Sequence, residues 1–410
     1  MEGGISSLLL ITSSIFMNKT LPAAIYVLGF TLFAMTTSEY MVAGLITSMS
    51  SDLGVSIPKV GYLITIYSLG MVFGGPFLAT FLVKLSNKAA LLTITGIFLV
   101  AQVVATVSAT YDLLAVARFA TGLSSAAFFG FALLTAAKMV PPERFGVAAS
   151  IVLGGMMIAT VAGLPLSAIL DQYYGWRVSF ALIIVLTALA GIGIILIVPK
   201  FQAEVKGSIK AEFSSIVNSS IWGAFITSFF IIAATFATFS YFVPYFENTV
   251  GFDTPYIPAI LFAYGAFTVV GNFLVGRLAD KSPIKVVFTG SVVLVLALCG
   301  LYTFYDNKIL VLVSVMILGL TGITLTPAMS SRVFKAAPNT SLINTMHTSV
   351  ICLGVVIGSW AGGYAIDQGY GYRAPTLIGI FLAGLAIVTL LPVLRNNRYD
   401  TPAVNPQTNI

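Results

Sequence analysis

The segment DQYYGWR at residues 171–177 recurs as DQGYGYR at residues 367–373, 196 residues further along the chain. At the same offset, five residues of the stretch 75–86 (Gly, Phe, Leu, Leu and Ser) recur within residues 271–282. Two separate stretches that agree on one offset indicate an internal repeat. The chain is therefore expected to contain two structurally similar halves joined by a linker.

The composition excludes most classes of soluble protein. Of the 410 residues, 58% are hydrophobic and 8% are charged, and the mean hydropathy is +1.01. Soluble domains carry about 25% charged residues, and a chain this apolar has too few polar side chains to cover a surface in water. A soluble enzyme, a disordered protein and a nucleic-acid binder are excluded. Cys299 and Cys352 lie inside apolar runs and predict no disulfide framework.

Twelve apolar runs are long enough to cross a bilayer, whose core of about 30 Å requires about 20 helical residues. They lie near residues 21–48, 60–83, 89–110, 113–137, 146–169, 178–199, 220–246, 256–277, 284–305, 308–333, 342–366 and 373–394. We therefore predict an all-α integral membrane protein with twelve transmembrane helices in two pseudo-symmetric six-helix bundles.

The repeat and the polar segments between the runs define the expected domains. Residues 20–199 form an N-terminal six-helix bundle, and residues 219–395 form a C-terminal one. A polar cytoplasmic linker at residues 200–218 joins the bundles, and residues 1–19 and 396–410 are expected to be tails.

The charges in the loops predict the orientation of the chain. The side that holds both termini carries 15 Lys and Arg residues, the other side carries 4, and Arg118 lies inside a span. Cytoplasmic loops carry an excess of Lys and Arg, so we expect a multi-pass protein of the cell (plasma or inner) membrane with both termini cytoplasmic. This distribution accounts for the net charge of +6 without a nucleic-acid partner.

Two six-helix halves with a site between them near the middle of the membrane are the plan of a secondary transporter. The sequence holds no phosphate-binding loop with its Lys and no nucleophile–base–acid set. We therefore expect no enzyme activity and no cofactor, so that transport depends on an ion gradient or runs downhill. A non-transporting membrane sensor with the same fold is an alternative.

Seven short motifs are shared with a known transporter family. They are TSEYMVAGL at residues 37–45, DLGVS at 52–56, RFATG at 118–122, PPER at 141–144, GWR at 175–177, FSYFVPY at 239–245 and GRLADK at 276–281. In this order they make the chain resemble the major facilitator superfamily over about residues 20–395. Within it, the chain is similar to the drug–proton antiporter group, in the branch of arabinose, purine-nucleoside and chloramphenicol exporters. The resemblance implies the fold of that superfamily, a monomer, and export of a small organic molecule in exchange for protons.

Glu39 is the acidic residue that lies deep inside a predicted span, whereas the other 13 acidic residues fall in loops, tails or helix ends. A charged side chain at this depth costs about 2.5–3.5 kcal/mol on insertion scales. Burial favours the neutral form of a carboxylic acid, which suits a group that gains and loses protons during transport. The alternative is a neutral Glu that is hydrogen-bonded to a neighbouring helix in a structural role.

Arg118 is the one basic residue expected to be buried in a helix, whereas the other Lys and Arg residues lie in loops, in tails or near the ends of the predicted spans. Because Arg stays charged in proteins, it requires an acceptor, and the candidates are Glu39 and the backbone carbonyls of the first helix. The resemblance implies a proton-relay or charge-balancing role. A purely structural tie between the first and fourth helices is the alternative.

Five further residues are candidates for substrate binding, each with a structural alternative. Tyr67 and Tyr241 could stack on a planar or amphipathic substrate, although aromatic residues at helical spacing usually pack or face lipid. Asn272 and Asn344 are polar candidates on the eighth and eleventh helices. His347 is the single histidine, and a lone buried His is more often a satisfied hydrogen-bonding group; metal binding is not expected, because no partner ligands stand at suitable spacing.

Two groups are candidates for gating. Gly163 and Pro165 in the fifth helix permit close packing and a kink, as a hinge or as a static feature. Arg277, Asp280 and Lys281 lie at the cytoplasmic end of the eighth helix, where carboxylate–guanidinium bonds could lock the halves together and break on opening. A plain cluster of positive-inside charges is the alternative for this second group.

The sequence as a whole predicts a proton-coupled exporter of drug-, nucleoside- or sugar-type molecules that works by alternating access, with Glu39 as the main protonation site. Its partners are a small-molecule substrate, protons and the lipid bilayer. A sugar or nucleoside facilitator, or a proton symporter, is the main alternative. Substrate identity cannot be carried over from relatives, because Cys352 stands where the branch often has Asn in helix eleven.

Overall fold

The computed structural model describes residues 21–82, 84–202, 219–336 and 341–395. The expected tails at 1–19 and 396–410 and most of the expected linker at 200–218 lie outside the described residues. The helices of the first half are α2 (Ala23–Leu53), α3 (Ile57–Leu82), α4 (Asn87–Val107), α5 (Tyr111–Met139), the short η1 (Pro142–Arg144), α6 (Phe145–Ile158), the π-helical η2 (Ala159–Gly163), α7 (Leu164–Tyr174) and α8 (Trp176–Ile197).

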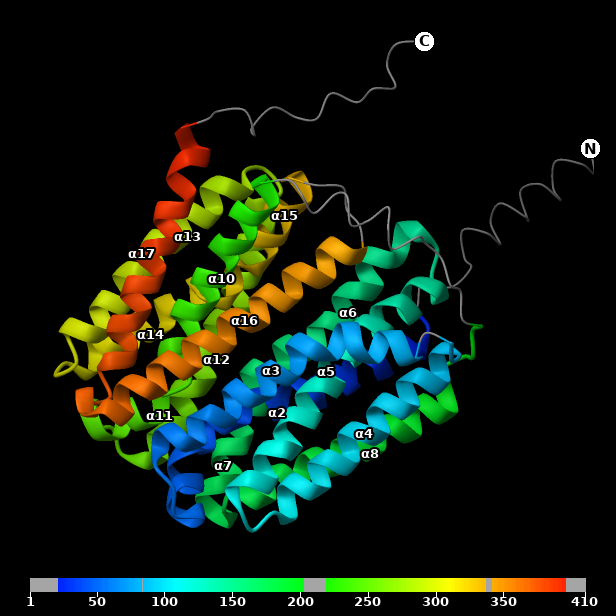
Figure 1. Ribbon diagram of the computed structural model, residues 1–410, viewed down its shortest axis with the longest axis horizontal. Helices are drawn as coiled ribbons and strands as arrows, with labels where there is room; N and C mark the ends of the chain where they lie inside the picture. The colour runs from blue at the N-terminus through cyan, green and yellow to red at the C-terminus, as the bar shows by residue number, and fades with distance from the viewer. Residues whose placement is uncertain (1–20, 83, 203–218, 337–340, 396–410) are drawn as a thin grey trace, which may run out of the picture.

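The second half repeats this plan (Figure 1). Its helices are α10 (Ser219–Phe239), α11 (Phe242–Tyr245), η4 (Phe246–Val250), η5 (Thr254–Tyr256), α12 (Ile257–Ala279), α13 (Pro283–Thr303), α14 (Lys308–Thr321), η6 (Ile323–Leu325), α15 (Thr326–Ala336), α16 (Ser341–Ala365), η7 (Ile366–Tyr370) and α17 (Ala374–Arg395). Within the described residues, twelve helices or continuous helical segments are long and apolar enough to cross a membrane. The predicted class, an all-α protein with twelve spans in two pseudo-symmetric bundles, is confirmed.

The first and fifth spans extend further than predicted. The first run was expected to end near residue 48, but α2 continues to Leu53 and ends at Gly54, whose φ of 62° lies in the left-handed region. The fifth was expected to end near residue 169, but α7 continues to Tyr174. Hydropathy locates the end of the apolar stretch, whereas the helix itself continues until a residue such as Gly terminates it.

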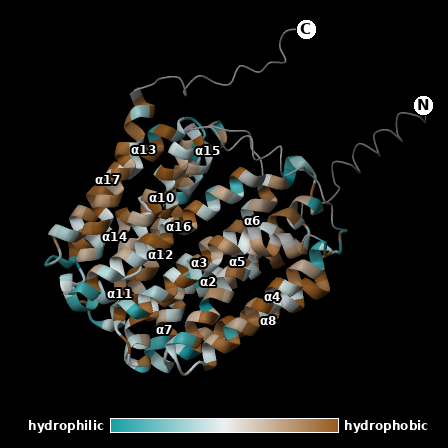
Figure 2. Cartoon of the chain, in the orientation of Figure 1, coloured by the Kyte–Doolittle hydropathy of each residue, from teal (hydrophilic) through white to brown (hydrophobic). Residues whose placement is uncertain are grey.

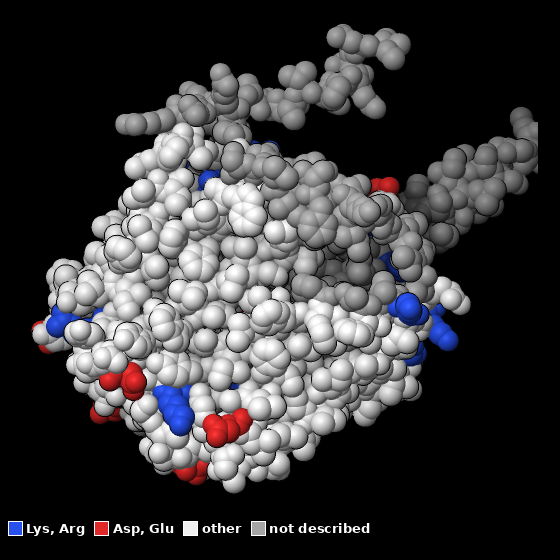
Figure 3. Space-filling model, in the orientation of Figure 1, with Lys and Arg blue, Asp and Glu red and all other residues white. Residues whose placement is uncertain are grey.

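The surface of the molecule is divided into an apolar belt and two polar ends. Hydrophobic residues occupy the middle of the helices, and hydrophilic residues gather toward their ends (Figure 2). On the face seen in Figure 3, Lys, Arg, Asp and Glu lie near the edges and leave a broad uncharged region between them. We call the end where α2 begins and α17 ends the basic end, and the end where α2 ends and α17 begins the opposite end.

The helices pack first within each half and then across the boundary. In the first half, α2 packs against α6 and α8, and α3 packs against α5; in the second, α10 packs against α16 and α17. Contacts across the boundary join α16 to α3, and α12 to both α7 and η2. Figure 1 shows α16 running along this boundary beside α3. A site between the halves is therefore lined by helices of both.

The repeated heptapeptide forms the same turn in both halves. Gly175 and Gly371 have φ angles of 82° and 75°, which side chains rarely adopt. Arg177 then donates to the carbonyl of Ser108, just after α4, and the corresponding Arg373 donates to the carbonyl of Tyr302, near the end of α13. The repeat in the sequence is thus a repeated tie between the sixth and third helices of each half.

We expect Gly175→Ala to lower the melting temperature of the protein in detergent. At φ 82° and ψ 158° the backbone conformation is one that is essentially limited to Gly, and such strain costs about 1–3 kcal/mol. Gly96→Ala is the matched control, because a Cβ at Gly96, inside α4, meets nothing within 4 Å. The control should stay at or slightly above the wild-type value, since Ala is the better helix former; equal melting temperatures for the two variants would contradict the role of the turn.

Candidate functional site

Glu39 lies near the middle of α2, 16 residues after Ala23 and 14 residues before Leu53. At 1.5 Å per residue it is more than about 20 Å from either end of the helix. The residue is 8% exposed, so the carboxyl group faces the protein interior and not the surrounding lipid. This position agrees with the burial that the sequence predicts for it.

Both halves of the molecule contribute to the surroundings of Glu39. Arg118 of α5, Tyr67 of α3 and the adjacent Tyr40 are close enough to interact with its charge. Cys352 of α16, in the second half, is also close enough to do so. The carboxyl group therefore lies where the two bundles meet, at the position that the transporter plan assigns to a binding site.

Arg118 is fully buried, and the backbone of α2 holds it in place. One terminal nitrogen (NH1) donates to the carbonyl oxygen of Ser38 at 2.7 Å and to its hydroxyl at 3.1 Å, and the other (NH2) donates to the carbonyl oxygen of Glu39 at 3.4 Å. Of the two acceptors that the sequence left open, the guanidinium uses the carbonyls. No ion pair joins the Arg118 and Glu39 side chains in the described part of the chain.

Tyr67 holds the guanidinium from the other side. Its fully buried ring lies 4.3 Å from the Arg118 guanidinium carbon, and its hydroxyl donates to the carbonyl oxygen of Met35 at 3.2 Å. A cation over an aromatic face is stabilised most strongly where water is absent. Tyr67 thus supports Arg118, and its contact with substrate stays a prediction.

A group of aromatic rings, which we call the aromatic wall, joins the Glu39 region to the second half. Tyr40 lies with its ring centroid 6.3 Å from that of Phe236 and 5.9 Å from that of Phe239. Phe239 in turn stacks on Tyr264 of α12, with centroids 5.3 Å apart and planes at 25°. All four rings are buried and pack against one another, and contact with a planar or amphipathic substrate stays a prediction.

The other predicted substrate residues are spread over the bundle. Asn272 directs its amide toward the Met157 sulfur across the boundary, at 3.6 Å. His347 is buried, with Nε2 2.9 Å from the Ser228 hydroxyl and its ring stacked on Phe225. Asn344 is exposed at the beginning of α16. Substrate contact by these three residues stays a prediction.

Tyr241 fills the contact between α3 and α16 at the opposite end. Its hydroxyl donates to the carbonyl oxygen of Ser359 at 3.0 Å, and the residue is fully buried. A Cβ atom built on Gly61 of α3, or on Gly363 of α16, would overlap the Tyr241 phenol group. The absence of side chains at these two glycines is what lets the ring fit between the halves.

The predicted gating residues fall into two distinct places. Gly163 ends the π-helical segment η2, where a side chain would overlap Thr37 of α2, and Pro165 follows in α7. The backbone of η2 also touches the second half, because Gly265 of α12 lies against the carbonyl of Thr160. These glycines provide close packing; a hinge motion at this segment stays a prediction.

Arg277, Asp280 and Lys281 are exposed at the end of α12. In the described residues no ion pair links Asp280 to either basic side chain, whereas an ion pair joins Asp52 to Arg177 at the opposite end. A latch that forms in another conformation of the transport cycle remains a prediction.

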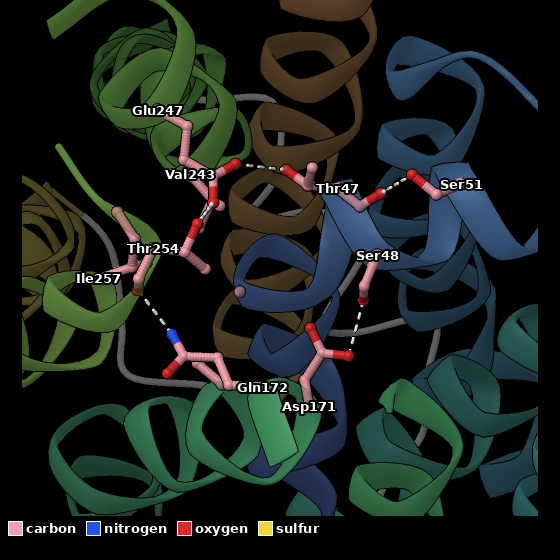
Figure 4. A pocket seen from close by; sticks show the side chains of 11 residues that line it. Thr47, Ser48, Ser51, Asp171, Gln172, Val243, Glu247, Thr254 and Ile257 are labelled. Atoms are coloured by element: carbon pink, nitrogen blue, oxygen red, sulfur yellow. Dashed lines mark hydrogen bonds between the residues drawn. The ribbon is translucent and has the colours of Figure 1, made fainter. Parts of the chain in front are cut away.

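A pocket of about 230 Å³ lies between the halves at the opposite end (Figure 4). Hydrogen bonds cross the boundary there: the Thr47 hydroxyl donates to the Glu247 carboxylate at 3.0 Å, and the Gln172 amide donates to the Thr254 carbonyl at 2.6 Å. Ser48 donates to Asp171 at 2.7 Å on the same wall. These contacts, together with Tyr241, join the two halves at this end.

Comparison with known proteins agrees with this architecture. The sequence profile of the Major Facilitator Superfamily matches residues 28–350. The chain belongs to the Major Facilitator Superfamily. It is therefore a multi-pass membrane transporter, and its superfamily consists of transport proteins and not of enzymes.

Several members of the superfamily are similar over nearly the whole chain. The putative transporter AraJ of Escherichia coli (strain K12) is 28% identical over 91% of this chain and 96% of its own length. The chloramphenicol resistance protein of Streptomyces lividans is 27% identical over the same shares of the two chains. The fold matches that of an inward-facing, unoccupied bacterial homolog of the human lysosomal transporter Spinster, with a TM-score of 0.73, 14% identity and coverage of 93% and 98%.

Sequence reasoning did not bring several residues together with Glu39. Tyr40 follows Glu39 directly, and Tyr264 and Cys352 reach the site only because α12 and α16 pack against the first half. Gln102 of α4 is a fully buried amide in the hydrogen-bonded surroundings of Arg118. A polar residue inside a predicted span was a usable signal for Gln102, whereas the place of Tyr264 depends on how α12 packs and had no signal in the sequence.

We expect Gly61→Ala to shift the protein toward a state that is open at the opposite end. The added methyl group would occupy the place of the Tyr241 phenol group, and overpacking of this kind costs about 1–3 kcal/mol, enough for roughly a tenfold change in the conformational equilibrium. Ser56 and Asp253 are exposed, one in each half. Spin labels at these two positions should show longer distances in double electron–electron resonance.

Gly75→Ala is the matched control on the same helix, because a Cβ there makes only one contact, at 3.9 Å to Thr345. Its distance distribution should equal that of the parent protein. An unchanged distribution in Gly61→Ala would mean that Tyr241 gives way locally and does not set the position of the halves.

Proposed function

We propose that this transporter exports small organic molecules in exchange for protons and that Glu39 is the protonation site. The observation that carries the proposal is a carboxyl group buried at mid-membrane, between both halves, whose neighbouring Arg118 is engaged by backbone carbonyls. An acid that forms no ion pair there is inexpensive to bury only while it is protonated. It can therefore give up its proton when a cargo molecule supplies compensating contacts.

The cycle follows from competition between proton and cargo at one place. Cargo that enters from the basic end contacts the aromatic wall and displaces the proton of Glu39. The halves then rock, the contacts of Thr47, Glu247 and Tyr241 at the opposite end separate, and cargo leaves on that side. A proton from that side neutralises Glu39 and favours the return. This cycle requires that the site holds either the proton or the cargo molecule, but not both at once.

The direction of transport and the orientation are part of the same proposal. We place the basic end, with both termini, on the cytoplasmic side of the cell membrane, according to the excess of Lys and Arg. Export is supported by similarity to a chloramphenicol resistance protein and to a probable sugar efflux transporter of Mannheimia succiniciproducens, 24% identical over 93% of this chain. The proposed working unit is a monomer, because each chain carries both halves of its site.

The cargo class that the site favours has an aromatic or apolar face together with a polar group. The aromatic wall (Tyr40, Phe236, Phe239 and Tyr264) supplies ring faces and edges, and Glu39 supplies one acidic group. A sugar or nucleoside facilitator, or a proton symporter, is the second candidate, and the neutral hydroxyl groups around the opposite-end pocket favour it. A pH gradient distinguishes them, because a facilitator does not respond to it and a symporter moves cargo along with protons.

We expect Glu39→Gln to abolish gradient-driven transport while leaving exchange intact. Proteoliposomes are loaded or bathed with labelled chloramphenicol, inosine or arabinose. A gradient of one pH unit should let the wild type accumulate cargo against the proton flow up to about tenfold for one-to-one exchange. The Gln variant should still equilibrate cargo across the membrane, because cargo that contacts the neutral amide has no proton to displace.

The matched control is Glu143→Gln, since Glu143 is exposed in η1 at the basic end. It should accumulate cargo as the wild type does. Equal gradient-driven accumulation in wild type and Glu39→Gln would refute the coupling role of Glu39, and movement of cargo in the same direction as protons would favour the symporter.

A further inference from the structure

Gln102 is a buried residue that is linked to Arg118 through the hydroxyl group of Ser38. It lies in α4 at 0% exposure, and its amide reaches two other helices. The amide nitrogen donates to the carbonyl oxygen of Phe180 in α8 at 3.3 Å, and the amide oxygen accepts from the hydroxyl of Ser38 in α2 at 3.0 Å. Burying a polar amide at this depth costs free energy. Its presence there therefore suggests a specific role.

The contacts of Gln102 fix a direction along a chain of hydrogen bonds. The Phe180 carbonyl can only accept, so the NH₂ side of the Gln102 amide must face it. The amide oxygen therefore faces Ser38, and the Ser38 hydroxyl must give its single proton to that oxygen. What remains toward Arg118 is a lone pair of the Ser38 oxygen, which accepts from the Arg118 guanidinium at 3.1 Å. Each orientation follows from the one before it.

This series of hydrogen bonds determines which acceptors Arg118 uses. Its NH1 nitrogen is shared between the Ser38 carbonyl and the Ser38 hydroxyl, while Tyr67 covers the face of the guanidinium. Without an oriented Ser38 hydroxyl, a donor would lose one acceptor in a dry environment. The nearest alternative with a full charge is the Glu39 carboxylate, which already interacts electrostatically with Arg118.

We propose that Gln102 is a positioning residue that, through Ser38, keeps the Arg118 guanidinium on the α2 backbone and so leaves the Glu39 carboxyl group open to protons. This inference rests on the proposed function of Glu39 and adds to it the means by which a nearby Arg does not neutralise the acid permanently. The groups that interact electrostatically with Glu39 are Arg118 from α5, Tyr67 from α3, Cys352 from α16 and the neighbouring Tyr40, which in turn interacts with Tyr264 of α12.

The test measures the protonation of Glu39 directly and requires no cargo. Infrared difference spectra of the purified full-length protein in lipid vesicles are recorded across pH, and the carboxylic acid band that disappears in Glu39→Gln is assigned to Glu39. In Gln102→Met, which keeps the side-chain length but makes no hydrogen bond, Arg118 is released toward the carboxylate. The midpoint of the Glu39 band should fall by about one to three pH units, the range that a close Arg produces.

Two further variants make the result specific. Ser38→Ala breaks the next link of the chain and should lower the midpoint in the same direction, and it serves as the readout if Gln102→Met does not yield folded, monodisperse protein. Thr95→Val is the matched control on α4, because Thr95 is a buried polar residue whose hydroxyl donates only to the carbonyl of Leu91 in its own helix. It should leave the midpoint at the wild-type value.

A wild-type midpoint in Gln102→Met or in Ser38→Ala would overturn the positioning role of Gln102. An equal shift of the midpoint in Thr95→Val would also overturn it. The failure of this inference is distinct from failure of the proposed function. If Glu39 titrates and the chain variants shift it, but the pH gradient drives no transport, the positioning role stands and proton coupling falls. If transport is coupled to protons but the midpoint does not move, only the role of Gln102 falls.

Discussion

The site depends on where one guanidinium group finds its acceptors. Arg118 is always charged and fully buried, so it must be compensated inside the protein. The structure compensates it with carbonyls at Ser38 and Glu39 and with the ring of Tyr67, and not with the nearest carboxylate. The acid and the base are thus adjacent without being paired. In the proposed cycle, this leaves Glu39 free to exchange a proton.

The contacts at the opposite end of the molecule complement this central arrangement. At the opposite end, the halves meet through side-chain hydrogen bonds from Thr47 and Gln172 and through the packing of Tyr241 against glycines. Contacts of this kind are polar or depend on a close fit. In the alternating-access mechanism that we propose, they would separate when Glu39 exchanges proton for cargo.

The sequence predicted the fold and singled out Glu39 and Arg118 for the same physical reason. Apolar runs of membrane-spanning length define twelve helices, and against that background a Glu or an Arg in mid-span is conspicuous because burial of charge is costly. The heptapeptide repeat at residues 171–177 and 367–373 correctly indicated two similar halves. The sequence pattern could not predict contacts between residues far apart along the chain. The acceptors of Arg118, the orientation of Ser38 by Gln102, and the seat of Tyr241 on Gly61 depend on how helices cross and which rotamers fit.

The central claim, that one carboxyl group exchanges its proton for cargo, is tested most directly by counting protons. Purified protein in weakly buffered detergent solution near neutral pH is mixed with saturating amounts of a compound that it transports, and the pH of the solution is followed. We expect release of up to one proton for each cargo molecule bound by the wild type, by linkage between the two ligands, and no release by Glu39→Gln at equal cargo binding. Proton release that persists in Glu39→Gln, or cargo binding by the wild type without any release, would contradict the central claim.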